Sequence, residues 1–427
     1  MLGTQQATGR LTLTALDIDY VRSQFPALAD GYGYLDNAGG SAVLKPVAER
    51  ITEYLLNHAV QLGASYAPSV KAGEKVLEAR ASVAQLINAR HSEECVMAGS
   101  TTLLLQLLAR AIAPSIGAGD EIIVTHSDHE ANIGPWQRLC EERGATLRVW
   151  SVDSSTLELE LQDLEALLGP RTRYVAMTHA SNILGSVNPV AQVAERVHAC
   201  GAKLVVDAVA YAPHRLVDVQ ASGADYYVFS FYKVFGPHFA VLWGKRELLL
   251  ELPSLNHFFI GQDVLPYKLQ PGNVNYELSY GCMGISDYLL DIGQRLGAEG
   301  SERQIMQAAF DAFEVQENGL AEILLGYLRE ADGVRIIGKP RVTAGDRVPT
   351  ISFVVEGVQS EAIVRRVDAA RIGIRFGDFY ARHLIEALGL APQGGVVRVS
   401  IAHYNTVDEM TRLVECLAHA IAELRPR

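Results

Sequence analysis

Ser230-Phe231-Tyr232-Lys233-Val234-Phe235-Gly236-Pro237-His238 is the most informative segment of this 427-residue sequence. In it, Lys233 follows an apolar run and precedes a Gly-Pro turn. A lysine in such a partly buried place loses solvation, so its pKa falls and its amine becomes a nucleophile able to form a Schiff base with an aldehyde. A surface lysine at the end of a strand is the alternative interpretation of this segment taken alone.

An acidic residue upstream favours the nucleophile. Asp207 closes the apolar run Lys203-Leu204-Val205-Val206-Asp207, 26 residues before Lys233. Because neighbouring parallel strands end at the same edge of a sheet, we expect both side chains in one crevice. A carboxylate there can keep a pyridine nitrogen protonated, which is what makes pyridoxal phosphate an electron sink. A helix N-cap or a salt-bridged acid is the alternative role of Asp207 alone.

Around this pair the chain alternates short β-branched or aromatic runs with amphipathic stretches, a pattern typical of α/β proteins. Seven runs are expected as strands: Cys95 to Met97, Glu121 to Thr125, Leu147 to Val152, Arg173 to Thr178, Lys203 to Asp207, Tyr226 to Ser230 and Phe239 to Trp243. Helical patterns lie between them at Thr101 to Ile112, Ile133 to Arg143, Leu161 to Leu168 and Val190 to Cys200. These patterns predict a mostly parallel seven-stranded sheet flanked by helices, with ligands at the carboxyl ends of its strands.

The last third of the chain predicts a smaller α+β domain. A long helical stretch from Gly281 to about Glu330 precedes three strand-like runs, a helical segment from Ser360, and a last helix that opens at Thr406 with the capping-box partner Glu409. The strand-like runs are Val334 to Ile337, Thr350 to Val355 and Val396 to Ile401. The expected organisation is an N-terminal segment over 1–20, a large domain over 21–280 and a small domain over 281–427.

Small hydroxyl residues predict a phosphate site. Thr101 and Thr102 open a predicted helix, whose N-terminus offers backbone N–H groups and the positive end of the helix dipole. Ser230 and Tyr232, beside the lysine, are placed to donate to the same phosphate. Ser and Thr also cap many helices with nothing bound, which is the alternative interpretation.

Two further polar clusters follow predicted strands. His129, in Asp128-His129-Glu130-Ala131-Asn132, is expected to stack on an aromatic cofactor ring, and a metal site is the less favoured alternative because no second cluster supplies ligands. Asn182 is placed to donate to a phenolate oxygen, and an Asx turn is its alternative. Arg398 lies within Val396-Val397-Arg398-Val399-Ser400, where it suits a substrate carboxylate or a structural ion pair, and Arg375 is a second candidate.

The charge balance excludes two classes of partner. The chain has 49 acidic and 37 basic residues, a net charge of −12, and no basic block, which argues against nucleic acid and against anionic membranes. Its five cysteines are scattered without metal-like spacing, which indicates reduced thiols and gives no sign of zinc. The polar N-terminus lacks the apolar core of a signal peptide, so we expect a cytoplasmic protein.

Seven groups of residues in order along the chain resemble the class V aminotransferases of PLP fold type I, and within them the cysteine-desulfurase-like branch. They are Tyr34-Leu35-Asp36-Asn37-Ala38-Gly39-Gly40, Thr101-Thr102, Asp128-His129-Glu130-Ala131-Asn132, Ser181-Asn182-Ile183-Leu184-Gly185, Val206-Asp207-Ala208, Tyr232-Lys233 with Gly236-Pro237, and Arg398 with Tyr404-Asn405-Thr406.

The resemblance implies a role for each candidate residue. It implies that Lys233 is the Schiff-base lysine and proton shuttle, Asp207 the partner of the pyridine nitrogen and His129 the stacking residue. Thr102, Ser230 and Tyr232 match phosphate-binding positions, Asn182 matches a contact to the cofactor or substrate, and Arg398 matches the clamp for the substrate α-carboxylate. The family is usually a homodimer, in which Gly272-Asn273 would reach the phosphate of the neighbouring subunit.

Departures from the branch bear on the reaction. Tyr380 stands where desulfurases carry a nucleophilic cysteine, Ala210 replaces a frequent glutamine, Tyr232 a frequent histidine and Asn273 a common threonine. A persulfide relay through Tyr380 is chemically excluded. We therefore expect a pyridoxal-phosphate enzyme acting on an amino acid, with carbon–sulfur lysis or related β-elimination favoured over transamination or epimerisation. A catalytically silent protein of the same fold is the hypothesis from another class.

Overall fold

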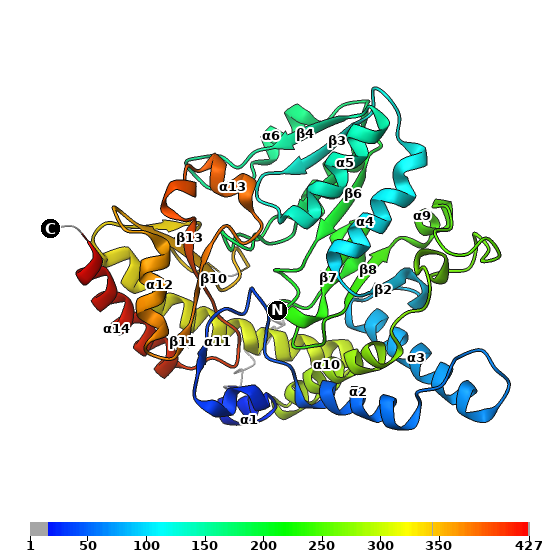
Figure 1. Cartoon of the computed structure of the whole chain (residues 1–427), viewed down its shortest axis with the longest axis horizontal. Coiled ribbons are helices and arrows are strands. Elements are labelled where there is room, and N and C mark those ends of the chain that lie inside the picture. Colours follow the sequence, from blue (N-terminus) through cyan, green and yellow to red (C-terminus); the bar gives the residue numbers. More distant parts are fainter. Residues whose placement is uncertain (1–15, 344, 426–427) are drawn as a thin grey trace, which may run out of the picture.

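A seven-stranded sheet forms the centre of the molecule in the computed structural model, which describes residues 16–343 and 345–425 (Figure 1). The strand order is β2-β8-β7-β6-β5-β3-β4. The strands are β2 (Cys95–Ala98), β3 (Glu121–Thr125), β4 (Thr146–Trp150), β5 (Thr172–Thr178), β6 (Lys203–Asp207), β7 (Tyr226–Ser230) and β8 (Ala240–Gly244). All neighbouring pairs are parallel except those that involve β8, so the predicted mostly parallel seven-stranded sheet is confirmed.

Two apolar clusters bury the faces of this sheet. Helices α4 (Thr101–Ile112) and α5 (Gly134–Arg143) pack on one face. Helices α6 (Leu161–Leu167) and α7 (Val190–Ala199) pack on the other, together with α10 (Tyr276–Arg295). Because both faces are covered, β3, β6, β7 and β8 are almost wholly buried, which explains why their sequences are continuous apolar runs.

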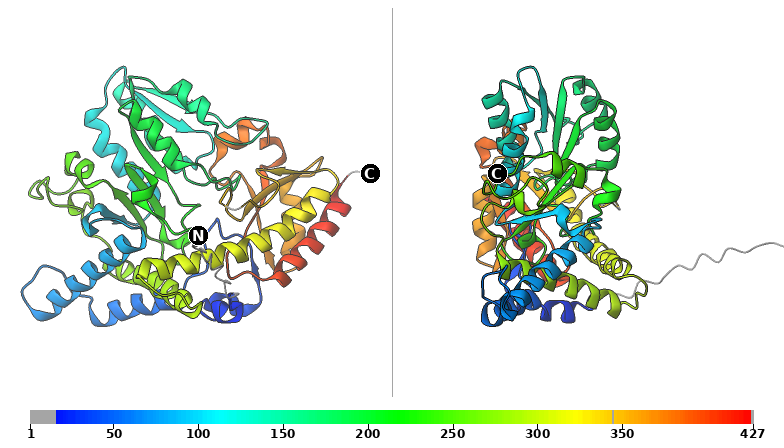
Figure 2. Two further views of the ribbon diagram at one scale, coloured as in Figure 1. Left: turned by 180° about the vertical axis from the view of Figure 1, so that it is seen from behind. Right: turned by 90° about the vertical axis from the view of Figure 1, so that its right-hand side faces the viewer.

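The prediction of one long helix from Gly281 to about Glu330 is wrong in one respect, because two helices occupy this stretch. The first, α10, ends at Arg295, and α11 (Glu302–Glu330) begins after a Ser301 capping box with Gln304. Gly297 and Gly300 lie between them with positive φ angles of 81° and 115°, a conformation that ends a helix. Helix α11 then runs from the seven-stranded sheet to the C-terminal sheet (Figure 2).

The C-terminal part contains a four-stranded antiparallel sheet in the order β12-β13-β10-β9. Its strands are β9 (Val334–Ile337), β10 (Thr350–Val355), β12 (Arg375–Gly377) and β13 (Val396–Ser400). Helices α12 (Ser360–Asp368) and α14 (Val407–Leu424) cover it, and the predicted Thr406–Glu409 capping box is present. The predicted strands and helices of this part are therefore found, and α13 (Arg382–Ala387) is added to them.

The N-terminal part pairs with the C-terminal part in a separate two-stranded sheet. Strand β1 (Gly33–Tyr34) pairs in parallel with β11 (Ile372–Gly373), and Leu35 lies in the C-terminal apolar cluster. The remaining helices are α1 (Ile18–Ser23), α2 (Lys45–Asn57), α3 (Ala67–Leu86), α8 (Val219–Ser222) and α9 (Arg246–Glu251). The domain boundaries remain a prediction; residue 280 falls within α10, and residues 1–15 of the expected N-terminal segment lie outside the described residues.

None of the helices in residues 16–343 and 345–425 combines the length and the apolarity needed to span a lipid bilayer.

Candidate active site

A cavity lies at the carboxyl ends of the parallel strands, where the sequence places its ligand site. The ends of β5, β6 and β7, the first turn of α4 and the turn after β3 all contribute to its lining. Eight of the predicted site residues line it together: Thr101, Thr102, His129, Asn182, Asp207, Ser230, Tyr232 and Lys233.

Lys233 is buried, with 7% of its surface exposed, so the alternative of a surface lysine is wrong. It ends a short 3₁₀ turn, Phe231–Lys233, that follows β7. Its Nζ has no hydrogen-bond partner among the described residues, whereas the other buried lysine, Lys268, donates to three backbone carbonyls at 2.7 to 3.1 Å. Burial and, secondarily, the charge of Arg398 lower the pKa of Lys233 to about 8. The amine is thus free and weakly basic.

Ser41 holds the lysine turn from both sides. Its hydroxyl donates to the Tyr232 carbonyl at 3.0 Å and accepts from the Phe235 N–H at 2.9 Å. Phe235 adopts a positive φ of 63°, and a Cβ added to Gly236 would lie 2.8 Å from Ile285 Cδ1. The turn therefore has one conformation, in which the lysine reaches the cavity.

Asp207 lies at the end of β6 and is 4% exposed. One carboxylate oxygen accepts the Val209 N–H at 2.9 Å. Burial raises the pKa of Asp207 to about 6, while that N–H and the charge of Lys233 act in the opposite direction. A protonated ring nitrogen in the cavity would give this carboxylate the cationic partner it lacks.

His129 is anchored by the turn that contains it. Its Nδ1 accepts the Ala131 N–H at 3.0 Å, so the proton of the neutral ring is on Nε2. Burial, followed by the charges of Lys233 and Arg398, lowers the pKa of His129 to about 4. A neutral imidazole in the cavity wall is suited to stacking on a ring.

Asp128, the residue before it, fixes this turn to the sheet. Its carboxylate accepts from the Thr125 hydroxyl, from the Thr178 N–H at 2.9 Å and from Asn132 Nδ2 at 2.7 Å. The Asn132 side chain in turn accepts the Trp136 indole N–H at 3.1 Å. Sequence reasoning assigns Asp128 no role of its own, because its partners lie on β3 and β5 as well as in its own turn.

Hydroxyl groups meet at the start of α4. Thr101 Oγ1 and Ser230 Oγ lie 2.6 Å apart, and the Ser100 side chain caps the helix by accepting the Leu103 N–H. Thr102 lines the cavity beside them. The first turn of α4 thus presents N–H groups and the positive end of the helix dipole to the cavity, an arrangement that suits a phosphate.

Arg398 projects from β13 and is 2% exposed. Its Nη2 donates to Asp36 Oδ1 at 3.0 Å and its Nη1 to the Asn182 carbonyl at 3.2 Å, whereas Nε is buried without a partner. The Asn182 amide donates to the Phe379 carbonyl at 3.0 Å. Arg398 is therefore a member of an ion pair with one buried, unused donor. It contacts Asn182 in the cavity wall but does not line the cavity itself, and both of its predicted roles stay open.

Two predicted site residues lie farther from the cavity. Arg375 has 56% of its side chain exposed and contacts Asp36 Oδ2 at 3.5 Å. Asn273 is exposed, and its Oδ1 accepts from the Tyr267 hydroxyl at 3.3 Å. Neither residue lines the cavity of a single chain. Within the described ranges, no group of three or more His, Cys, Asp or Glu side chains is arranged to hold a metal ion.

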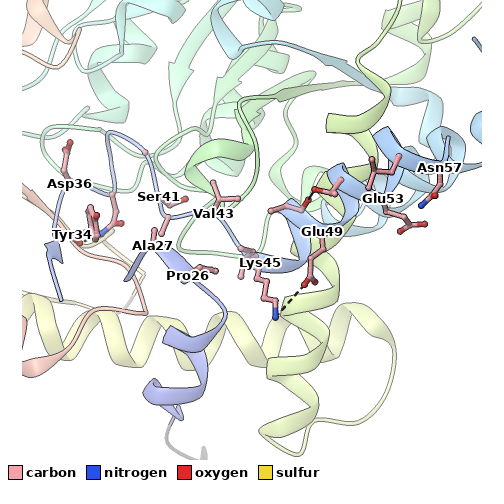
Figure 3. Close-up of a pocket in the computed structure, with 17 residues that line it drawn as sticks. Pro26, Ala27, Tyr34, Asp36, Ser41, Val43, Lys45, Glu49, Glu53 and Asn57 are labelled. Atoms are coloured by element: carbon pink, nitrogen blue, oxygen red, sulfur yellow. Dashed lines mark hydrogen bonds and ion pairs between the residues drawn. The ribbon is translucent and has the colours of Figure 1, made fainter. Parts of the chain in front are cut away.

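A second, larger cavity of about 950 Å³ adjoins this site. It is a groove along α2 that Figure 3 shows, running from Asp36 past Val43 to Asn57. Leu56, at one end, is 78% exposed, and Val43 is 40% exposed. Asp36, which lines the groove, is the partner of Arg398, and Arg398 in turn donates to the carbonyl of Asn182 in the cavity wall.

Comparison with known proteins agrees with this geometry. Residues 33–413 match the family described as aminotransferase class-V. The chain belongs to the class-V aminotransferase family. The class-V relatives include the aminotransferase-like protein FGM3 of Gibberella zeae, 39% identical over 95% of this chain and 99% of that protein. The cysteine desulfurase-like protein ustD of Aspergillus flavus is 34% identical over 96% of this chain and 91% of its own.

Solved structures confirm the fold of this class-V chain. The cysteine desulfurase CsdA of Escherichia coli has a TM-score of 0.82 and 27% identity, over 96% of this chain and all of that one. The cysteine desulfurase of Thermococcus onnurineus has a TM-score of 0.84 and 26% identity, over 96% and 99% of the two chains. The resemblance and PLP fold type I predicted from the sequence are confirmed.

Members of the class-V family use pyridoxal 5′-phosphate, and the cavity suits it. Lys233 Nζ has no partner, Asp207 is buried without a cationic hydrogen-bond partner, His129 is neutral, and α4 directs its N-terminus to the same space. These are the groups that an aldehyde, a pyridine nitrogen, an aromatic ring and a phosphate require.

Proposed function

We propose that this protein is a pyridoxal-phosphate enzyme that removes a proton from Cα of an amino acid and expels a substituent from Cβ, without a cysteine nucleophile. Carbon–sulfur lysis is the favoured instance. When bound, the cofactor supplies a sink for the electron pair left at Cα. Lys233 would hold the cofactor and then carry the Cα proton, which its lowered pKa of about 8 suits near neutral pH.

The observation that carries the proposal is the absence of a thiol at the cavity. None of the five cysteines, all within the described part of the chain, lines it. Burial raises the pKa of the Cys140 thiol to about 11 and also raises that of Cys95 and Cys282, so these thiols are protonated at neutral pH. Tyr380 occupies the loop position at which the resemblance calls for a cysteine. An elimination needs no sulfur acceptor on the protein.

The other groups have supporting roles in this proposal. Asp207 would keep the ring nitrogen protonated, and His129 would stack on the ring. Thr101, Thr102, Ser230 and Tyr232 would hold the phosphate, while Arg398 with Asn182 would bind the substrate α-carboxylate, and Arg375 would assist. Class-V aminotransferase chemistry is the second candidate, since returning the proton to the cofactor rather than to Cα leads to transamination. Epimerisation and catalytic silence are the remaining alternatives.

The visible spectrum of the holoenzyme, followed with product assays in L-cysteine, cystine and other amino acids, tests the proposal. Elimination predicts pyruvate, ammonia and released sulfur, with full recovery of the starting absorbance. A stoichiometric shift to the pyridoxamine form with a keto acid would replace elimination by transamination, and exchange of the Cα proton with loss of chirality would indicate epimerisation. No spectral response to any amino acid would favour the silent protein.

We also infer that the active protein is a homodimer. The groove along α2 is lined mostly by carbon and exposes Val43 and Leu56, and Leu55 of the same helix is 50% exposed. Exposed apolar surface of this extent is typical of an interface. A second copy on this groove would adjoin Asp36. The family resemblance implies in addition that Asn273 reaches the phosphate of the neighbouring subunit.

A further inference from the structure

Two consecutive bulky residues, Phe379 and Tyr380, adopt left-handed backbone conformations, with φ angles of 52° and 59°. Residues with a Cβ rarely visit this region, because the Cβ crowds the following carbonyl. Such a conformation persists only where the surroundings hold it, and it is concentrated at functional sites. The pair follows β12 in the loop that carries Tyr380 at the departure from the desulfurase pattern.

Groups at the cavity hold this loop. Asn182 Nδ2 donates to the Phe379 carbonyl at 3.0 Å, and the N–H of Glu130, next to His129, donates to the Tyr380 carbonyl at 2.7 Å. The loop adds its own bond, from the Tyr380 N–H to Asp378 Oδ1 at 3.0 Å. The strained conformation is therefore tied to the two cavity walls that contain Asn182 and His129.

Phe379 covers one face of the Arg398 guanidinium. Its ring centroid lies 3.7 Å from Arg398 Cζ, and the side chain is 8% exposed. With that face covered, and with Asp36 and the Asn182 carbonyl fixing two edges, the plane of the guanidinium is set. Within the described residues, Nε is the buried donor of this guanidinium that has no partner.

Tyr380 has the opposite environment. Its ring centroid lies 5.2 Å from that of His129 at a tilt of 35°, yet the residue is 70% exposed. Packing in the core therefore does not account for its strained position. Its place beside His129, on the loop that covers Arg398, puts an aromatic ring at the side of the cavity.

We propose that Phe379 is a positioning residue that orients Arg398 for the substrate carboxylate, and that Tyr380 forms a wall with His129 that limits the size of the substrate side chain. The inference deepens the proposed function and rests on it. It predicts two separable effects. A change at Phe379 weakens the binding of every amino acid alike, and a change at Tyr380 alters the ratio between the Kd values of small and large amino acids.

Spectrophotometric titration of the holoenzyme with L-alanine and L-phenylalanine measures both effects directly, since it reports the Kd of each amino acid without turnover. Phe379→Ala should raise both Kd values roughly tenfold, the scale of a lost cation–π contact in a dry site. Tyr380→Ala should improve the affinity for L-phenylalanine relative to that for L-alanine by roughly tenfold, the scale of size discrimination in a pocket. Tyr380→Phe, which keeps the ring, should retain the wild-type ratio.

Phe379→Leu is the second variant at that position, because leucine fills much of the same space without an aromatic face. It should also weaken the binding of both amino acids. Phe376→Ala is the control on the neighbouring strand; its side chain, in a residue 36% exposed, is outside the proposed wall, and both Kd values should stay at wild type. An unchanged ratio in Tyr380→Ala, or a ratio in Tyr380→Phe equal to that of Tyr380→Ala, would overturn the inference alone. A wild-type holoenzyme that responds to no amino acid would overturn the proposed function and the inference with it.

Discussion

Arg398 Nη2 donates to Asp36 Oδ1 at 3.0 Å, which joins two residues 362 positions apart in the chain. The pair links the loop after β1 to β13, and Arg398 also contacts Asn182 of the cavity wall. Burial lowers the pKa of Arg398 to about 10, with Asp36 acting in the opposite direction, so the guanidinium remains charged at neutral pH. Asp36 therefore holds a buried cation in place, and we propose that this cation binds the substrate carboxylate.

Replacement of Arg398 by Lys should raise the Kd for amino acids by roughly 10- to 100-fold, the scale of charged hydrogen bonds, because an ammonium cannot reproduce the fork of donors. Affinity for pyridoxal phosphate should change much less. Absorbance titrations of the variant with amino acid and of its apoprotein with cofactor measure the two constants. Equal amino-acid affinity in variant and wild type would make Arg398 a structural ion-pair partner only.

Lys233→Ala should abolish the covalent attachment of pyridoxal phosphate. Borohydride reduction followed by peptide mass spectrometry checks this, with a label expected on Lys233 in the wild type and on no residue in the variant. Lys268 is the internal control, because its amine is buried and donates to three backbone carbonyls away from the cavity. A label on another lysine of the variant would contradict the assignment.

Cofactor capture by the apoprotein should depend on pH with a midpoint near 8. The lowered pKa of Lys233 leaves about a quarter of the amine neutral at pH 7.5, compared with about one part in a thousand for an ordinary lysine. Because the neutral amine is the nucleophile, the rate should rise about tenfold per pH unit below 8 and level off above it. Stopped-flow absorbance measures this rate. A continuous rise to pH 10 would show an unperturbed lysine.

Gly185→Ala should destabilise the protein by about 3 kcal/mol or more, because the new Cβ would lie 2.3 Å from the Thr350 carbonyl oxygen and φ is +70°. Gly63→Ala is the matched control: φ is +87°, but nothing lies within 4 Å of the added Cβ, so only the backbone cost of about 1 to 2 kcal/mol remains. Denaturant unfolding of the two variants compares them. Equal losses of unfolding free energy in the two variants would show that the backbone at Thr350 moves aside at no cost.

Leu56→Glu should shift the proposed homodimer toward monomer, because a charge on the groove along α2 would be desolvated by a second copy. Light scattering coupled to size exclusion at micromolar concentration measures the mass. Val407→Glu is the control, since Val407 is 59% exposed at the start of α14 and does not line the groove. A dimer that persists in Leu56→Glu and dissociates in Val407→Glu would place the interface at the start of α14 instead of on the groove.

Local patterns predicted the sheet and the residues at its strand ends. Runs such as Lys203 to Asp207 are apolar because both faces are covered, and parallel strands must end at one edge, so Asp207 and Lys233 were expected in the same cavity. The break between α10 and α11 carried its own signal in Gly297 and Gly300, which the expectation of one long helix passed over.

Local sequence patterns do not predict contacts between residues that are distant in the sequence. Ser41 and Asp36 contact Tyr232 and Arg398 from the loop after β1, and no periodicity or turn residue predicts such contacts. The left-handed conformation of Phe379 was equally hidden, because left-handed positions are expected at Gly or Asn.

The pairing of β1 with β11 can form only late in the synthesis of the chain. Gly33 and Tyr34 leave the ribosome early, but their partners Ile372 and Gly373 follow roughly 20 to 70 s later at ordinary rates of synthesis. Until then the nascent chain can bury Lys233 and Asp207 in the seven-stranded sheet while it still lacks Arg398. A prematurely terminated chain would therefore retain the groups proposed to hold the cofactor and lack the group proposed to recognise the substrate.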